Sequence, residues 1–187
     1  METKTVFFVG KPGCGKGTQA DLLAKATGWP VVSTSSGLRA LVAEDGAVGR
    51  KLQETMDSGI LTPYWMASYV YLKSLFATSE NGAVIFDGTG RTLPEAHIVH
   101  DSLLWIGKQF VIFHLKVSDE EVKKRIELRK ATAGRADDHM VDKRLEEYYA
   151  NTGPAIDYYR ETGILMEIDG ERSPEAIAEE VRRILDI

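Results

Sequence analysis

Two groups of residues in this sequence have types and spacings suited to phosphate chemistry. The first is a glycine-rich run at residues 10–16, which reads G-x-x-x-x-G-K and is followed by Gly17 and Thr18. In such a loop the backbone N–H groups surround a phosphate and the lysine, here Lys16, neutralises its oxygens. A serine or threonine usually follows the lysine and reaches Mg²⁺, so Gly17 marks a variant of the motif. An apolar, β-rich run at residues 5–9 precedes the loop and a helical pattern follows it, which favours a phosphate site over a simple turn.

The second group consists of arginines, two of them in a helical pattern at residues 118–132. Arg125 and Arg129 are four residues apart, so a helix places both on one face, where they can address one polyphosphate or stack on a base. Glu121 lies four residues before Arg125, and a solvated ion pair between these two side chains is the alternative interpretation. Phosphoryl transfer requires alignment and positive charge rather than covalent help from the protein, and a loop lysine with several arginines can supply both.

Apolar, strand-like runs alternate with helical patterns along the chain. Nearly continuous apolar strands that alternate with helices indicate an α/β protein with a doubly wound parallel sheet covered on both faces. The predicted strands cover residues 5–9, 31–33, 83–86, 110–117 and 165–168. The predicted helices cover residues 15–27, 36–57, 62–79, 94–106, 118–132, 139–161 and 173–186. Roughly 45 residues separate the second and third strands, where a connection needs only about a dozen, so a helical insertion over the ligand edge of the sheet is predicted at about 36–79.

Composition narrows the classes of protein further. With 187 residues, 43% hydrophobic and 27% charged, the chain is predicted to form one domain. Its net charge of −5 argues against general nucleic-acid binding, and Cys14, the only cysteine, excludes a disulfide within the chain. No apolar run approaches the roughly 20 residues of a membrane span, and no charged and then apolar leader opens the sequence. The expectation is a soluble, cytoplasmic protein that binds neither membranes nor nucleic acids.

Five short motifs resemble those of the adenylate kinase family of nucleoside monophosphate kinases. Residues 10–19, GKPGCGKGTQ, are similar to the family loop G-x-P-G-x-G-K-G-T-Q, in which glycine follows the lysine. Residues 87–92, DGTGRT, look like D-G-F-P-R-T, and residues 33–39, STSSGLR, look like S-T-G-D-x-L-R. Residues 56–63 resemble the family's M-x-x-G-x-L-V-P, and residues 125–144 resemble its arginine-rich lid region in the short form. The motifs occur in family order, and the resemblance covers nearly the whole chain.

This resemblance implies a P-loop NTPase-type fold, which is a doubly wound sheet of five parallel strands, in a single kinase domain over residues 1–187. It implies that the insertion at about 36–79 binds a nucleoside monophosphate acceptor and that a short lid at about 130–139 closes over the site. The implied reaction is the transfer of the γ-phosphoryl group of ATP to AMP with Mg²⁺. The implied partners are small-molecule nucleotides alone, and the implied state is a monomer.

The resemblance also implies a role for each matching residue. ATP contacts are implied for Gly13, Cys14, Gly15, Lys16, Gly17, Thr18, Arg125 and Arg129. Acceptor contacts are implied for Thr34, Arg39, Ile60, Leu61, Thr62, Gly88, Arg91, Glu95, Arg135 and Arg144. Positive charge on the transferring group is implied for Lys16, Arg91, Arg129, Arg135 and Arg144. Mg²⁺ binding through water is implied for Thr18 and Asp87.

Departures from the family pattern cluster on the acceptor side. Ser35 and Ser36 replace a Gly-Asp pair, although either serine also suits the N-cap of a helix. Thr89 and Gly90 replace a Phe-Pro pair. The alternatives to an AMP kinase are therefore a UMP/CMP kinase, a GMP kinase or a nucleotide-binding sensor that has lost catalysis. A kinase for a sugar-like acceptor is disfavoured, because Gly17 stands where such a kinase has serine or threonine.

Glu95 stands where adenylate kinases usually carry a glutamine that pairs with the adenine edge. A glutamine amide can both accept and donate hydrogen bonds, whereas an ionised carboxylate only accepts them. The sequence therefore predicts a weakened selectivity for AMP, which Glu95→Gln sharpens. The alternative interpretation is that Glu95 starts the helix after Pro94, where a carboxylate suits the positive end of the helix dipole.

Overall fold

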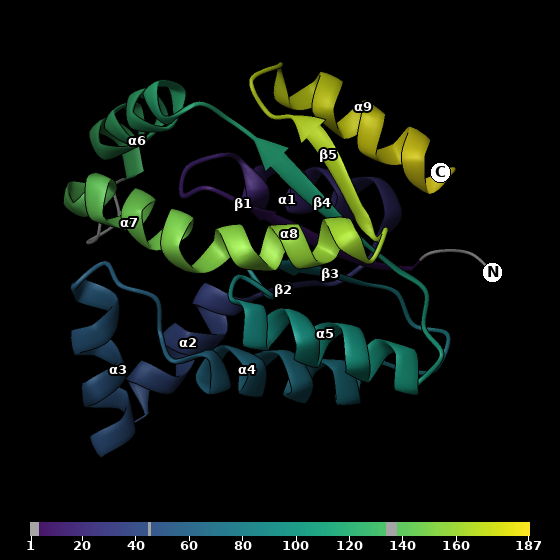
Figure 1. Cartoon of the computed structure of the whole chain (residues 1–187), viewed down its shortest axis with the longest axis horizontal. Helices are drawn as coiled ribbons and strands as arrows, with labels where there is room; N and C mark the ends of the chain where they lie inside the picture. The colour runs from purple at the N-terminus through teal and green to yellow at the C-terminus, as the bar shows by residue number, and fades with distance from the viewer. Residues whose placement is uncertain (1–3, 45, 134–137) are drawn as a thin grey trace.

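The computed structural model describes residues 4–44, 46–133 and 138–187. Its centre is a five-stranded sheet of parallel strands in the order β2-β3-β1-β4-β5 (Figure 1). The strands are β1 (Thr5–Gly10), β2 (Val31–Ser33), β3 (Val84–Asp87), β4 (Phe110–Lys116) and β5 (Leu165–Asp169). The predicted α/β class with a doubly wound parallel sheet is confirmed. Because β1 lies in the middle, the chain winds outward from it in both directions, which is the arrangement that opens a ligand crevice at the carboxyl edge of a sheet.

Every residue of β1 is buried, because the strand is covered on both faces. Side chains of successive residues alternate, so Val6 and Phe8 point to one face while Phe7 and Val9 point to the other. Phe7 stacks on Phe86 of β3, with the ring centroids 4.8 Å apart. A parallel strand covered on both faces needs an apolar side chain at every position, which explains the uninterrupted apolar run in the sequence.

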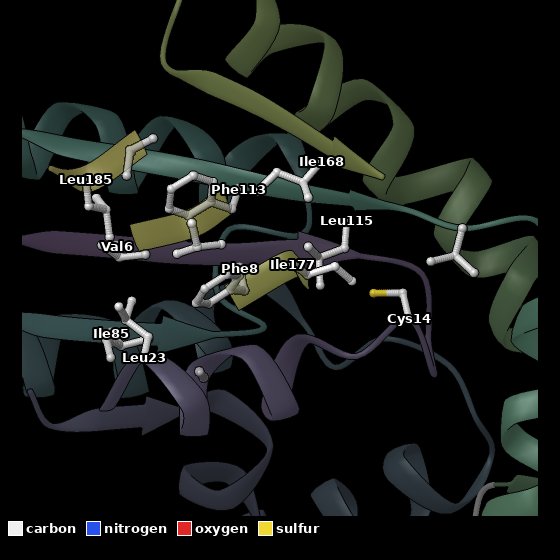
Figure 2. Close-up of a cluster of buried hydrophobic side chains, with 14 of the residues drawn as sticks. Val6, Phe8, Cys14, Leu23, Ile85, Phe113, Leu115, Ile168, Ile177 and Leu185 are labelled. Carbon is white, nitrogen blue, oxygen red and sulfur yellow. The ribbon is translucent and has the colours of Figure 1, made fainter. Parts of the chain in front are cut away.

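Two helical layers enclose the sheet (Figure 1). The layer on the face of Val6 and Phe8 consists of α1 (Lys16–Thr27), α6 (Asp119–Ala133) and α9 (Pro174–Leu185). Figure 2 shows this face, where side chains of β1 and β4 meet Leu23 of α1 and Ile177 of α9. The opposite layer consists of α4 (Tyr64–Ala77), α5 (Leu93–Trp105) and α8 (Gly153–Glu161). In the part of the chain that the structure describes, no helix has both the length and the apolarity to cross a membrane.

Three helices connect β2 to β3, namely α2 (Thr34–Ala43), α3 (Ala47–Asp57) and α4. The predicted single helix over residues 36–57 is wrong, because α2 ends at an extended Glu44 and α3 begins afterwards. The break lets the apolar faces of the three helices pack on one another. This packing forms a small core of Leu38, Leu52, Met66 and Val70.

The start of α2 also differs from the prediction. Ser33 is the N-cap, and its hydroxyl accepts a hydrogen bond from the N–H of Ser36 at 3.4 Å. Neither Ser35 nor Ser36 takes this position. Ser33 suits the role because it ends a strand and keeps the extended φ and ψ (−93° and 117°) that an N-cap requires. The helix therefore starts at the carboxyl edge of the sheet.

A π-helical turn, Tyr148–Thr152, joins α7 (Val141–Glu147) to α8. The sequence predicted one helix over residues 139–161, and the structure shows that it is interrupted. This segment begins with a 3₁₀ turn, Asp138–Met140, and its helix widens at the π turn. Pro154 explains the widening, because it has no N–H to donate to the preceding turn and its ring crowds that turn.

Candidate active site

A cavity of about 1050 Å³ lies at the carboxyl edge of the sheet. It exceeds the roughly 300–1,000 Å³ of a pocket for one drug-sized ligand. Its wall contains the predicted site residues Gly13, Cys14, Gly15, Lys16, Gly17, Thr18, Arg39, Ile60, Leu61, Thr62, Asp87, Gly88, Arg91, Arg125, Arg129 and Arg144. Arg135 lies outside the described residues. The ends of β1 and β3, the helices between β2 and β3, and α6 and α7 therefore meet around one space.

The glycine-rich loop forms one end of this cavity. Gly13 and Gly15 have left-handed φ values of 75° and 102°, and a Cβ on Gly13 would lie 2.9 Å from Cγ1 of Ile126 in α6. The ammonium of Lys16 donates to the carbonyl oxygens of Gly10 at 2.9 Å and Lys11 at 2.8 Å. Since α1 begins at Lys16, the loop combines a cation with the positive end of a helix, which is an arrangement that binds phosphate.

Cys14 packs into the protein core rather than presenting its thiol to the cavity. Its side chain is 1% exposed and belongs to the apolar cluster around Leu115 and Ile177 (Figure 2). The sulfur also lies 3.5 Å from the Lys16 ammonium. The small side chain therefore anchors the loop to the sheet.

Asp87 and Thr18 lie where a magnesium ion on bound phosphates can be reached. Asp87 ends β3, in register with Phe8 of β1 and Ser33 of β2. Its Oδ2 would lie 3.6 Å from a Cβ placed on Gly17, so the bare glycine leaves this carboxylate facing the start of α1. Among the described residues, no group of three or more His, Cys, Asp or Glu side chains could hold a metal ion. One carboxylate and one hydroxyl fit Mg²⁺, which keeps several waters and binds mainly through substrate phosphates.

The arginines in the wall of the cavity come from the helices α2, α6 and α7 and from the loops before α5 and α9. Arg125 of α6 donates to Glu121 at 2.8 Å, which is the ion pair of the alternative interpretation, and also to the carbonyl oxygen of Cys14 at 3.3 Å. Arg39 of α2 donates to the hydroxyls of Ser35 at 3.4 Å and Ser36 at 3.2 Å. Arg91 has a buried Nε without a hydrogen-bond partner among the described residues. A buried guanidinium N–H of this kind fits an anionic ligand in the cavity.

Thr34 and Glu95 do not line the cavity. Thr34 is fully buried, and its hydroxyl lies 2.8 Å from the hydroxyl of Thr89. The structure therefore corrects the expectation that Thr34 faces the acceptor. The Thr34–Thr89 hydrogen bond instead ties the start of α2 to the loop after β3.

Glu95 is only 4% exposed, and its carboxylate faces the loop before α5 instead of the cavity. Its Oε2 accepts the N–H groups of Gly90 at 3.1 Å and Arg91 at 3.0 Å, and its Oε1 accepts the hydroxyl of Thr92 at 3.1 Å. Burial raises the pKa of the Glu95 carboxyl, while the charge of Arg91 and these hydrogen bonds lower it. Glu95 thus does not face the cavity, and it lies in the first turn of α5, where the alternative interpretation placed it.

Several residues of the cavity wall were missed in the sequence. At the phosphate-loop end they are Gln19, Arg172, Pro174 and Ile177, near the turn at residues 59–62 they are Leu38, Met56 and Glu147, and Tyr148 lies beside His114 of β4. Gln19 donates to the carbonyl oxygen of Pro174 at 3.0 Å, which joins α1 to the start of α9. The signal for Arg172 was its position just after a strand, because carboxyl ends of parallel strands share one edge. Glu147 gave no such signal; it accepts the N–H of Leu61 at 3.4 Å across the cavity.

Gly90 is predicted to tolerate no side chain. Its φ of 73° is left-handed, and a Cβ there would collide with the hydroxyl of the fully buried Tyr159. We expect Gly90→Ala to lower the free energy of unfolding by about 2–5 kcal/mol, from backbone strain and overpacking together. Chemical denaturation measures this loss. Gly107→Ala is the matched control, since Gly107 has a φ of 70° but no described atom within 4 Å of its Cβ, and equal losses in both variants would contradict the collision.

The site combines a phosphate loop on the central strand, a group of helices across the cavity and arginines between them. This combination defines a P-loop phosphotransferase. The sequence matches the family model described as adenylate kinase over residues 8–164. The chain belongs to the adenylate kinase family.

Named relatives match along almost the entire chain. The sequence is 34% identical over 184 residues to an adenylate kinase of Maricaulis maris (strain MCS10), which covers 97% of this chain and 98% of that protein. It is 35% identical over 189 residues to an adenylate kinase of Brucella melitensis biotype 1, with 96% and 97% covered. It is 36% identical over 177 residues to an adenylate kinase of Leptospira biflexa, with 93% and 95% covered. The match therefore includes both the phosphate-loop end and the acceptor side.

Proposed function

We propose that this protein transfers the γ-phosphoryl group of magnesium-bound ATP to AMP and forms two molecules of ADP. The observation that carries the proposal is that one cavity contains Lys16 of the phosphate loop together with Arg39 and Arg91 from the acceptor side. Phosphate-binding groups from two directions suit a reaction between two nucleotides. The named relatives are adenylate kinases, and this chain matches them along nearly their full lengths, which supports AMP as the acceptor.

In the proposed reaction, an oxygen of the AMP phosphate attacks the γ-phosphorus of ATP as the bond to the bridging oxygen of ADP breaks. A phosphate monoester has a second pKa near 6, so at neutral pH the acceptor is mostly a dianion and needs no general base. The protein has only to align the two phosphates and to stabilise charge on the transferring group. This requirement agrees with a site built from cations rather than from an acid and base pair.

We assign the donor phosphates to the backbone of residues 13–18 and to Lys16, and the acceptor phosphate to Arg39 and Arg91. Arg129, Arg144 and Arg135, the last of which lies outside the described residues, would stabilise the transferring group. Arg125 would contact ATP. Asp87 and Thr18 would hold Mg²⁺ through water, and the bound ion neutralises charge on the phosphates.

The turn at residues 59–62 and the apolar side chains beside it would receive the acceptor base. Leu38 and Met56 supply apolar surface there, and Thr62 is 8% exposed. Ile60 and Leu61 line the cavity, so backbone groups of this turn are accessible from it, and the N–H of Leu61 donates to Glu147 of α7. The helices between β2 and β3 would thus act as the acceptor-binding region.

We also propose that residues 130–139, of which 134–137 lie outside the described residues, act as a short lid that excludes water during transfer. A water molecule in place of AMP would turn the enzyme into an ATPase. A monomeric state, which the family resemblance implied, and cytoplasmic localisation complete the proposal.

An acceptor assay tests the function. The purified protein is incubated with magnesium and ATP and with AMP, CMP, UMP, GMP or a deoxynucleoside monophosphate, and the formation of nucleoside diphosphate is measured against a reaction without acceptor. We expect AMP to give the highest kcat/KM and the reaction without acceptor to give little phosphate release. A higher kcat/KM for UMP, CMP or GMP would overturn AMP as the acceptor. Nucleotide binding without transfer to any acceptor would identify a sensor instead.

A further inference from the structure

The loop between β3 and α5, residues 88–92, is held from inside the protein by buried polar groups. We name it the acceptor loop. The carboxylate of Glu95 accepts three hydrogen bonds from it, at 3.0–3.1 Å, from two backbone N–H groups and one hydroxyl. The hydroxyl of Tyr159 donates to the carbonyl oxygen of Gly90 at 3.2 Å, and Thr34 contacts Thr89. Each of residues 89–92 is therefore fixed by at least one buried partner.

This network determines the position of Arg91. Glu95 binds the backbone N–H of Arg91, so it fixes the point from which the guanidinium extends into the wall of the cavity. The Nε of Arg91 is buried and has no partner within the described chain, so its hydrogen-bonding capacity is kept for a ligand. A guanidinium held in place binds a phosphate with less loss of side-chain freedom than a mobile one.

The two departures from the family pattern at positions 90 and 95 fit each other. A proline at position 90 would have no N–H for Glu95 to accept, and its fixed φ near −65° is incompatible with the observed 73°. Glycine supplies both the N–H and the left-handed backbone. The carboxylate at position 95 is then fully used by the loop, with Oε2 accepting two N–H groups and Oε1 accepting the Thr92 hydroxyl.

We propose that Glu95 is a positioning residue that holds the acceptor loop so that Arg91 can bind the phosphate of a nucleoside monophosphate, and that it does not read the acceptor base. This proposal rests on the proposed function in one respect, namely that Arg91 binds the acceptor phosphate. Base selectivity then comes from the turn at residues 59–62 and its neighbours, and position 95 affects phosphate binding without changing the preference among bases.

Two substitutions at Glu95 and one matched control test the proposal. Glu95→Gln keeps an oxygen that can accept both N–H groups and gains an NH₂ that can donate to the Thr92 hydroxyl, so we expect AMP KM and the AMP:GMP:UMP ratios to stay within about threefold of wild type. Glu95→Ala leaves the two N–H groups without their acceptor, and we expect kcat/KM for AMP to fall about 10- to 100-fold while KM for ATP changes less than about twofold.

Glu175→Ala is the matched control. Glu175 also follows a proline in the first turn of a helix, α9, but its side chain is exposed. We expect wild-type kinetics from this variant, because it also removes a carboxylate from the first turn of a helix but does not touch the acceptor loop. A loss equal to that of Glu95→Ala would show that helix stability, and not loop positioning, is responsible.

Amide hydrogen exchange of Gly90 and Arg91, followed by NMR, supplies a readout that does not depend on catalysis. We expect faster exchange at these two N–H groups in Glu95→Ala and protection in Glu95→Gln. If Glu95→Ala does not fold, Thr92→Val removes one of the three hydrogen bonds with little change of shape, and we expect a smaller rise in AMP KM from it.

The outcomes separate the two proposals. The wild-type protein could transfer phosphate to no acceptor while residue 95 still controlled amide exchange at Gly90 and Arg91. That result would overturn the proposed function but leave the hydrogen bonds of Glu95 to the acceptor loop supported. An active wild type whose AMP:GMP ratio shifts about tenfold or more in Glu95→Gln would show that Glu95 reads the base. Unchanged AMP kinetics in Glu95→Ala would overturn the positioning role.

Discussion

Replacing Lys16 by alanine is expected to lower phosphoryl transfer by about 10²-fold or more in kcat while the protein stays folded. Lys16 places its ammonium across the phosphate loop, against the carbonyl oxygens of Gly10 and Lys11. A fixed positive charge aimed at the developing charge of a transition state is typically worth at least about 10²-fold in rate. The loop itself is shaped by glycines and anchored by Cys14, so its backbone does not depend on the lysine.

The measurement is steady-state kinetics with saturating magnesium, ATP and AMP, accompanied by thermal unfolding. Lys11→Ala is the matched control, because Lys11 belongs to the same loop but pairs with Asp119 at 2.5 Å. We expect that control to keep kcat within about tenfold of wild type, since Lys11, unlike Lys16, does not line the cavity. Normal turnover by Lys16→Ala at saturating substrates would mean that the loop is not the donor site.

Replacing Arg91 by alanine is expected to lower kcat/KM for AMP by about 10²- to 10³-fold, with the loss divided between KM and kcat. Arg91 lines the cavity and keeps a buried, unpartnered Nε among the described residues, which suits a ligand with several oxygens. The acceptor loop should keep its shape, because Glu95 binds the backbone N–H of Arg91 and not the side chain. We therefore expect the free energy of unfolding to change by only about 1 kcal/mol or less.

Arg91→Lys separates charge from geometry. A lysine keeps the positive charge but lacks the planar fork that binds two phosphate oxygens, so we expect it to recover only part of the lost kcat/KM. Measurements of KM for ATP provide the control, since the donor side should be unaffected. If KM for AMP were unchanged and KM for ATP rose instead, Arg91 would belong to the donor phosphates and the assignment of the two sides would be reversed.

Local patterns were sufficient to predict the class of fold and the donor end of the site. The strand, glycine-rich loop and helix at the start of the chain are contiguous, and their chemistry needs no distant partner. The uninterrupted apolar runs predicted buried parallel strands because burial on both faces removes the alternation of polar and apolar residues. Element ends were less certain, as the break at Glu44 shows, because the core of α2, α3 and α4 forms only when three separate segments meet.

On the acceptor side, the sequence offered two roles for Glu95, and local chemistry was compatible with both. The folded chain decides between them through burial and through the donors that surround the carboxylate. Thr34 is a similar case: its motif suggested a ligand, but its hydroxyl contacts Thr89, 55 residues away. A single sequence does not record which polar groups become neighbours when distant segments pack.

The sequence by itself therefore determined the phosphate loop, the parallel α/β fold and the arginines available to the site, because each is a property of residue type and short-range spacing. The tertiary structure decided which side chains reach the cavity. It brought Gln19 to Pro174, 155 residues apart, and placed Arg172 in the wall of the cavity. It also turned Glu95 inward to the acceptor loop. The physical reason is that a buried polar group must find its hydrogen-bond partners inside the fold, and only the packed chain determines which partners are within reach.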